Sequence, residues 1–181
     1  MPKMPTALLA ALTVAFWAIS VGAAMSDKEK AELAPVVANA KVTLEEGLKT
    51  SKKNGKPVSA KFDIENGKPQ LSIYTVRDGI KYFEVIVDHN TGEIAKAEPI
   101  IGGDDLTAAK KQSDSLFRAT RELREAVKEA KRDNPGYLAV SVWSDMKDGH
   151  SVATVTLVKD NDWKTVVNDL TVYRTLIKEE P

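Results

Sequence analysis

The chain has 181 residues, and its 26 basic residues balance its 26 acidic residues. Nucleic-acid-binding proteins usually carry a basic excess or a clustered basic face, so this balance argues against nucleic acid as a partner. There is no cysteine, which excludes disulfides, thiolate metal sites and the lipid-bearing cysteine of a bacterial lipoprotein.

Residues 1–24 have the features of an export signal. Lys3 precedes an uncharged apolar run from Thr6 to Val21, and small residues follow it. Signal peptidase prefers such residues, so we predict cleavage near Ala23 or Ala24 and a periplasmic or secreted bacterial protein. The alternative is an uncleaved anchor, with membrane contact only in that case. We favour cleavage because the run is shorter than the about 20 apolar residues of a spanning helix.

Two helix signals follow the predicted signal. Residues 25–40 predict an N-terminal helical segment, which Pro35 is expected to bend or interrupt. Thr43 and Glu46 have the spacing of a capping box, so a second helix is expected to begin there. Asn54-Gly55 is typical of a helix end.

Three runs of alternating apolar residues come next, at Val58–Ile64, Leu71–Val76 and Tyr82–Val87. The turns between them contain Asn66-Gly67 and Asp78-Gly79, which are favoured in tight hairpins. These features predict an antiparallel meander with the second helix packed across it.

The residues after the third run form a turn and then restart a strand. The turn contains Asp88, Asn90, Thr91 and Gly92, and Glu93 follows. Together with Val87, this pattern resembles the closing hairpin of the PepSY domain family, and the resemblance extends over residues 41–98. It implies a non-enzymatic extracytoplasmic module. In propeptides of thermolysin-type proteases, such modules are associated with inhibition and folding assistance.

The second half predicts a similar order of elements. Asp104-Asp105 is expected to begin a long helix that ends at Asn134-Pro135-Gly136, and strands follow at 138–143, 152–158 and 163–167. The predicted apolar positions of the helix are Leu106, Leu116, Phe117, Leu123, Val127 and Ala130. Asn168-Asp169 is not followed by Thr-Gly-Glu, so this half is interpreted as a degenerate copy.

The resulting prediction is an α+β fold with two PepSY-like units, each a helix packed on an antiparallel β-meander. The units are assigned to residues 41–101 and 102–181, after the signal at 1–24 and the helical segment at 25–40.

Neither catalysis nor a cofactor is predicted. The two histidines, His89 and His150, fall in predicted turns, without the converging ligands that a metal site needs. Asp88–Gly92 weakly resembles the start of a calcium loop but lacks the glutamate at its twelfth position, so a turn stabilised by the Asp88 side chain is favoured.

Aromatic and apolar side chains on the outward face of the predicted sheets suggest a protein-binding surface, because aromatics are enriched at interfaces. The alternative is that the other unit, the N-terminal helix or a dimer partner covers this face. The predicted partner-binding residues are Tyr74, Val76, Tyr82, Ile86, Tyr137 and Trp143.

The leading functional hypothesis is therefore an exported protein that binds another protein, with inhibition or regulation of a secreted or envelope peptidase as the specific form. The alternative is a periplasmic carrier of a small apolar ligand or envelope component, held in a pocket between helix and sheet.

Overall fold

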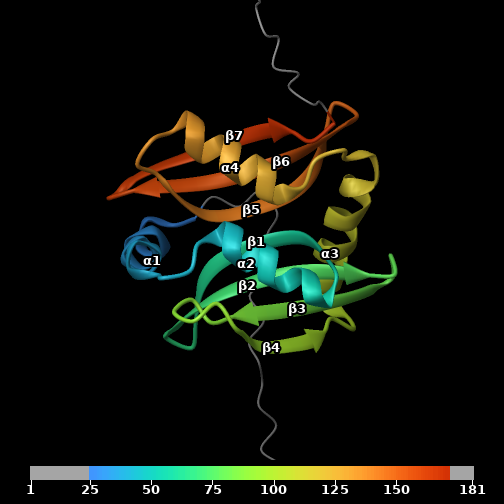
Figure 1. Ribbon diagram of the computed structural model, residues 1–181, viewed down its shortest axis with the longest axis horizontal. Helices are drawn as coiled ribbons and strands as arrows, with labels where there is room; N and C mark the ends of the chain where they lie inside the picture. The colour runs from blue at the N-terminus through green and yellow to red at the C-terminus, as the bar shows by residue number, and fades with distance from the viewer. Residues whose placement is uncertain (1–24, 172–181) are drawn as a thin grey trace, which may run out of the picture.

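One continuous antiparallel sheet contains all seven strands in the computed structural model, which describes residues 25–171 (Figure 1). The strand order is β4-β3-β2-β1-β5-β6-β7. The strands are β1 (Lys56–Glu65), β2 (Lys68–Arg77), β3 (Lys81–Val87), β4 (Ile94–Pro99), β5 (Leu138–Lys147), β6 (His150–Lys159) and β7 (Asp162–Asp169). The prediction of two helix-on-meander units is wrong, because β1 and β5 pair at the centre and join all the strands into one sheet.

The pairing between β1 and β5 is short. It contains three residue pairs, Ser59 with Trp143, Ala60 with Val142, and Lys61 with Ser141. Helices α1 (Asp27–Asn39) and α3 (Gly103–Ser115) both contact β1 and β5. They lie at opposite ends of this central seam, at the left and right of Figure 1. The two helices therefore pack where the central strands are no longer paired.

The hairpin turns predicted at Asn66-Gly67 and Asp78-Gly79 are confirmed, and Asp148-Gly149 forms a third turn of the same kind. Asn66, Asp78 and Asp148 have φ of 52°, 54° and 51°, and each is followed by a glycine with φ between 72° and 80°. Two successive positive φ angles are what a type I′ turn requires. The loops at Asn66 and Asp148 have two residues each, whereas the loop at Asp78 has a third residue, Ile80, because Arg77 pairs with Lys81. These turns set the register of the three hairpins that they close.

Helix α1 begins at a capping box and continues through Pro35. Ser26 and Glu29 form the box, which the sequence interpretation had not identified. The predicted interruption at Pro35 is wrong. A proline removes one backbone hydrogen bond, while Leu33, Ala34 and Val37 on the same helix are buried in the core. We infer that this burial offsets the missing bond.

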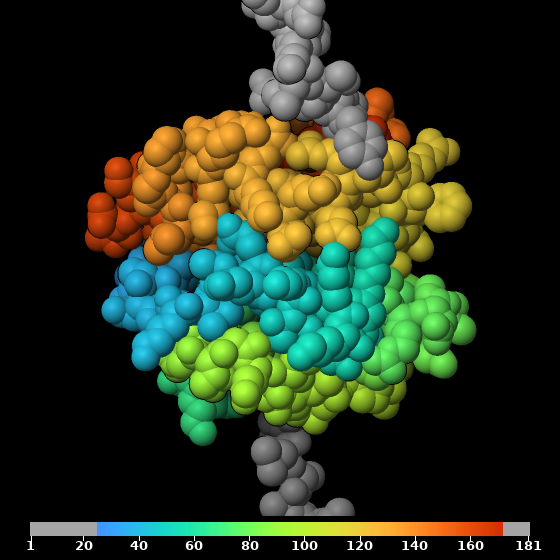
Figure 2. Space-filling view, viewed as in Figure 1, coloured from blue at the N-terminus to red at the C-terminus, as the bar shows by residue number. Residues whose placement is uncertain are grey.

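Helices α2 (Leu44–Ser51) and α4 (Leu123–Asp133) lie side by side across one face of the sheet (Figures 1 and 2). The predicted capping box of α2 is confirmed, since the Thr43 backbone N–H donates to Glu46 Oε2 at 2.7 Å. A short 3₁₀ helix, η1 (Lys52–Asn54), follows α2. Beneath the two helices, the side chains that are fully buried include Ile73, Val85, Val142 and Val155.

The single long helix predicted after Asp104 is wrong. Helix α3 passes into a 3₁₀ turn, η2 (Leu116–Arg118), and α4 begins only at Leu123. Between them, the backbone N–H groups of Thr120 and Arg121 donate to the Leu170 carbonyl at 2.9 and 3.1 Å. These bonds to the end of β7 replace helical bonds and turn the chain.

Candidate binding surfaces

Four of the predicted partner-binding residues share the sheet face opposite α2. Val76 pairs with Tyr82 and Ser72 pairs with Ile86, so Tyr74, Val76, Tyr82 and Ile86 point to the same side. Tyr74, Val76 and Tyr82 are buried, and Ile86 is half-buried. The Tyr74 hydroxyl donates to Asp105 Oδ1 at 2.6 Å, and burial raises the pKa of this tyrosine. Most of this group therefore packs inside the protein.

Trp143 lies on the same face but apart from Ile86. It pairs with Ser59, and the polar pair of Lys61 and Ser72 occupies the strands between it and Ile86. On β3, Glu84 accepts a hydrogen bond from Ser72 at 2.7 Å, and burial raises the pKa of this carboxyl. Ile86 and Trp143 are half-buried and remain candidate contact residues, but they do not form one apolar patch.

Tyr137 lies on the opposite side of the sheet, which corrects its predicted place beside Trp143. Ala139 pairs with Leu157 whereas Val142 pairs with Val155, so one extra residue is inserted between them. This bulge reverses the alternation of side chains. The Tyr137 ring packs under Lys164 Nζ at 4.4 Å from the ring centroid, and its hydroxyl donates to Asp162.

The turn at residues 88–92, which resembles the PepSY pattern, is held by hydrogen bonds to its own backbone and to the chain before α2. Asp88 Oδ1 accepts the backbone N–H groups of Asn90 and Thr91 at 2.7 and 3.0 Å, and these bonds hold the pKa of Asp88 below its usual range. The carbonyl of His89 accepts the N–H groups of Lys41 and Val42, both at 3.0 Å. The turn thus holds the entry to α2 against the β3–β4 hairpin.

The other histidine has an acidic neighbour that the sequence did not indicate. Nδ1 of His150 lies 3.8 Å from Asp169 Oδ2 and 3.4 Å from Thr171 Oγ1. His150 is exposed. Within residues 25–171, no group of three histidine or acidic side chains is arranged to hold a metal ion.

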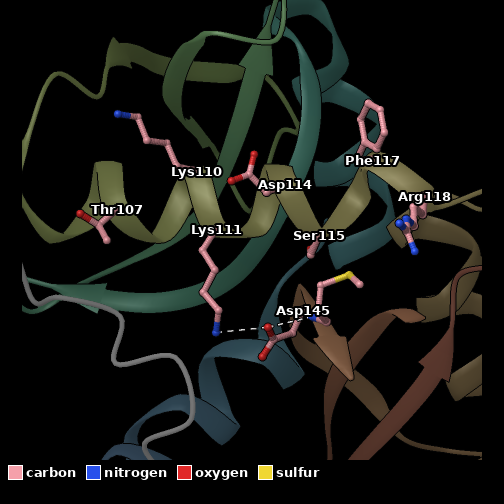
Figure 3. Close-up of a pocket in the computed structure, with 9 residues that line it drawn as sticks. Thr107, Lys110, Lys111, Asp114, Ser115, Phe117, Arg118 and Asp145 are labelled. Carbon is pink, nitrogen blue, oxygen red and sulfur yellow. Dashed lines mark hydrogen bonds and ion pairs between the residues drawn. The ribbon is translucent and has the colours of Figure 1, made fainter. Parts of the chain in front are cut away.

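An exposed aromatic side chain marks a different surface, at the end of α3. Phe117 is 90% exposed, although the neighbouring Leu116 is buried. Phe117 borders an open depression of about 640 Å³, which we call the Phe117 surface; its lining residues are Thr107, Lys110, Lys111, Asp114, Ser115, Phe117, Arg118, Asp145 and Met146. Figure 3 shows the Phe117 ring projecting from the chain and Lys111 reaching toward Asp145, 3.2 Å away.

Other exposed apolar side chains lie at the same end of the molecule. Ile80 follows β2, Ile101 follows β4 and Met146 lies near the end of β5, with exposures of 75%, 89% and 43%. These strand ends lie on one side of the sheet. The end of β2 pairs with the start of β3, since Arg77 pairs with Lys81, and the end of β4 also pairs near the start of β3, since Pro99 pairs with Phe83. The end of β5 lies beside the start of β1. This end therefore concentrates apolar surface.

A second opening lies between the ends of α2 and β2 and the start of α4. We call it the cationic cleft, and its volume is about 410 Å³. Its floor consists of the buried residues Leu48, Pro57, Val76, Leu116 and Leu123. Its rim carries five cations, Lys52, Lys56, Arg77, Arg121 and Arg124, and two carboxylates, Asp78 and Glu122.

The comparisons with known proteins do not place the chain in a family. No family model matches the sequence, and a search of curated proteins finds no match. Among solved structures, the chain is similar to the crystal structure of a "putative lipoprotein" from Clostridium difficile, with 15% sequence identity and a TM-score of 0.42. That similarity covers 73% of this chain and 88% of the other.

The export prediction rests on residues that the structure does not describe. Residues 1–24 fall outside the described range. Across residues 25–171, none of the helices has the length and apolar character that crossing a membrane requires.

Proposed function

We propose that this is an exported, non-enzymatic protein that binds another protein through the Phe117 surface. The observation that carries the proposal is the 90% exposure of Phe117 at a position that the fold holds firmly. Leu116 on one side is buried, and the Ala119 N–H donates to the Leu116 carbonyl at 3.2 Å. An aromatic ring presented from an ordered backbone loses little conformational entropy when it binds.

The composition of the surface fits a protein partner. Aromatic residues, methionine and arginine are enriched in protein interfaces, and Phe117, Met146 and Arg118 meet here. The remaining charges have both signs, with Lys110 and Lys111 beside Asp114 and Asp145. An anionic membrane surface would instead favour a basic cluster with few acids.

The resemblance to PepSY domains adds a class of partner to test. It points to a secreted or envelope peptidase, which this protein would inhibit or regulate from outside the cytoplasm. The carrier hypothesis expected an apolar pocket between helix and sheet. The two openings described above both carry charged side chains on their rims, which argues against a purely apolar ligand in either of them.

Affinity capture from an extract of the bacterial envelope tests the proposal. Immobilised wild-type protein should retain a partner that the Phe117→Ser variant loses, with at least a tenfold fall in affinity, because a central aromatic anchor commonly contributes about 2 kcal/mol or more. Val167→Ser is the matched control, since Val167 is also exposed, at 49%, but lies on the edge strand β7.

Peptidases from the same extract should then be assayed with and without the purified protein. Inhibition by wild-type protein and its loss in Phe117→Ser would support the peptidase form of the proposal. Equal retention of partners by the wild-type and Phe117→Ser proteins would contradict the assignment of the surface.

A further inference from the structure

We propose that the cationic cleft is a second binding site, and that its ligand is a small amphipathic anion with a carboxylate or phosphate head on an apolar body. The site is separate from the Phe117 surface, although consecutive residues border the two. Leu116 lines the cleft, whereas Phe117 lines the neighbouring depression. The inference extends beyond protein binding to a ligand of defined chemistry.

The floor of the cleft is suited to an apolar group. Leu48, Leu116 and Leu123 are 1%, 4% and 3% exposed, and they come from three different elements. The volume of about 410 Å³ falls within the range of small-molecule sites. A short alkyl chain or an aromatic ring would gain contact with this floor without displacing any of the core.

Two of the five rim cations are already neutralised. Lys52 lies 2.7 Å from Glu122 Oε1, and Arg121 lies 2.6 Å from Glu129 Oε2. Arg121 also donates to the Asp169 carbonyl at 3.0 Å. These contacts hold the walls of the cleft, so they are not expected to be the main ligands of an incoming anion.

The other three cations, Lys56, Arg77 and Arg124, have no carboxylate within ion-pair distance among the described residues. Arg77 is fixed by hydrogen bonds to Asn54, at 3.1 Å to the carbonyl and 3.3 Å to Oδ1. Its guanidinium also lies over the Phe83 ring, 4.7 Å from the centroid. A guanidinium held in this way is ready to pair with a carboxylate or phosphate.

Arg124 provides a second, independent indication of a ligand. Its Nε atom is buried and has no hydrogen-bond acceptor within the described part of the chain. Buried donors are nearly always paired, because an unpaired one loses its hydration without replacement. An anionic oxygen in the cleft would supply the missing acceptor.

The ligand must combine both properties. A purely apolar molecule would leave the three cations unpaired, and an inorganic anion would leave most of the about 410 Å³ of the cleft unfilled. The start of α4 is already occupied by its own capping box of Glu122 and Glu125. The charge of the ligand is therefore met by side chains and not by the helix end.

Calorimetric titration of the purified full chain tests the inference, with octyl phosphate and octanoate as ligands below their micelle concentrations. Inorganic phosphate and 1-octanol serve as the head-only and tail-only controls. We expect at least one octyl anion to bind tenfold or more tightly than either control, and the stronger of the two identifies the preferred head group. The Lys56→Gln/Arg124→Gln variant should bind it at least tenfold more weakly.

The matched control is Lys53→Gln, because Lys53 is exposed on η1 beside the cleft without lining it. Its affinity should stay within twofold of wild type. In the wild-type protein, the ligand should also shift the backbone amide NMR signals of Leu116, Leu123 and Arg124. Equal binding of 1-octanol or inorganic phosphate, signal shifts confined to other regions, or an equal effect of the two variants would overturn the proposal.

Discussion

Lys131 Nζ lies 2.8 Å from Glu45 Oε1, and this ion pair joins the end of α4 to the start of α2. At the other end of the same helix pair, Lys52 lies 2.7 Å from Glu122. The two helices therefore run antiparallel, with one ion pair at each end. The pairs differ in burial: the side chains of Lys131 and Glu45 are 27% and 14% exposed, whereas those of Lys52 and Glu122 are 43% and 50% exposed.

Replacing Lys131 with methionine should destabilise the protein by about 2 kcal/mol, because it leaves the carboxylate of Glu45 poorly hydrated and without its cation. Glu45 Oε2 already has no partner among residues 25–171. The matched change Lys52→Met should cost less than about 1 kcal/mol, since exposed pairs contribute little. Urea unfolding of both variants measures the difference, and equal losses would contradict this account of burial.

Gly47→Ala should lower stability even though alanine favours a helix. A Cβ at this position would lie 2.5 Å from Leu71 Cδ2 and 3.1 Å from its Cγ. Leu71 is fully buried, so overpacking at about 1–3 kcal/mol should exceed the helix gain of about 1 kcal/mol. Thermal unfolding should show a lower Tm for Gly47→Ala. Adding Leu71→Val should recover part of the loss, and a higher Tm for the single variant would contradict the close packing.

A cysteine pair at positions 61 and 141 tests the continuity of the sheet. Lys61 and Ser141 are directly paired across the central seam, where Cα atoms lie about 4.5–5.5 Å apart, within the range of a disulfide. The chain has no other cysteine. Lys61→Cys/Ser141→Cys should therefore oxidise to a monomer that gains stability of about 4 kcal/mol. The offset pair Asp63→Cys/Ser141→Cys should not form this disulfide. The same low yield of the oxidised monomer from both pairs would contradict the pairing of β1 with β5.

The stability contributed by Glu129 should depend on pH. Arg121 donates to its Oε2 at 2.6 Å and holds the pKa of this carboxyl below the usual value of about 4.5. A lowered pKa in the folded state stabilises the protein fully above pH 4.5, and the contribution is lost as pH falls through the lowered value. Glu129→Gln should thus cost about 2 kcal/mol at neutral pH.

Thermal unfolding at pH 7 and near pH 3 checks the direction of this pH dependence. The lower pH lies roughly one to two units below the ordinary pKa of a carboxyl group. The difference between wild type and Glu129→Gln should shrink at the lower pH. Glu32→Gln is the control, because the Glu32 side chain is 51% exposed on α1. A difference for Glu129→Gln that is unchanged between the two pH values would rule out the proposed origin of the stabilisation.

Local features were predictable from the sequence because they depend on neighbouring residues. The capping box of Thr43 and Glu46 and the turns at Asn66-Gly67 and Asp78-Gly79 are examples. The joining of β1 to β5 was not, because it involves residues about eighty positions apart and only three pairs. The bulge between Ala139 and Ser141, which moves Tyr137 to the other face, was also not predictable, because no residue in that segment is typical of a bulge.

The Phe117 surface was missed because Phe117 was assigned to an apolar helix face. The spacing of apolar residues did offer a signal. Leu116, Leu123, Val127 and Ala130 are separated by seven, four and three residues, which places them on one face of a helix. Phe117 is one position after Leu116 and therefore falls outside that face. The cationic cleft had no comparable signal. Its rim combines Lys56 and Arg77 with Arg124 from a distant helix, and only the folded chain brings them together.

The most direct test of the proposed function places a photoreactive cross-linker at position 117 of the protein in living cells. A benzophenone side chain there resembles the native phenylalanine, and the same group at position 167 serves as the control. We expect a covalent adduct with another protein from position 117 and none from position 167. Absence of an adduct at 117, or the same adducts from both positions, would contradict binding through the Phe117 surface.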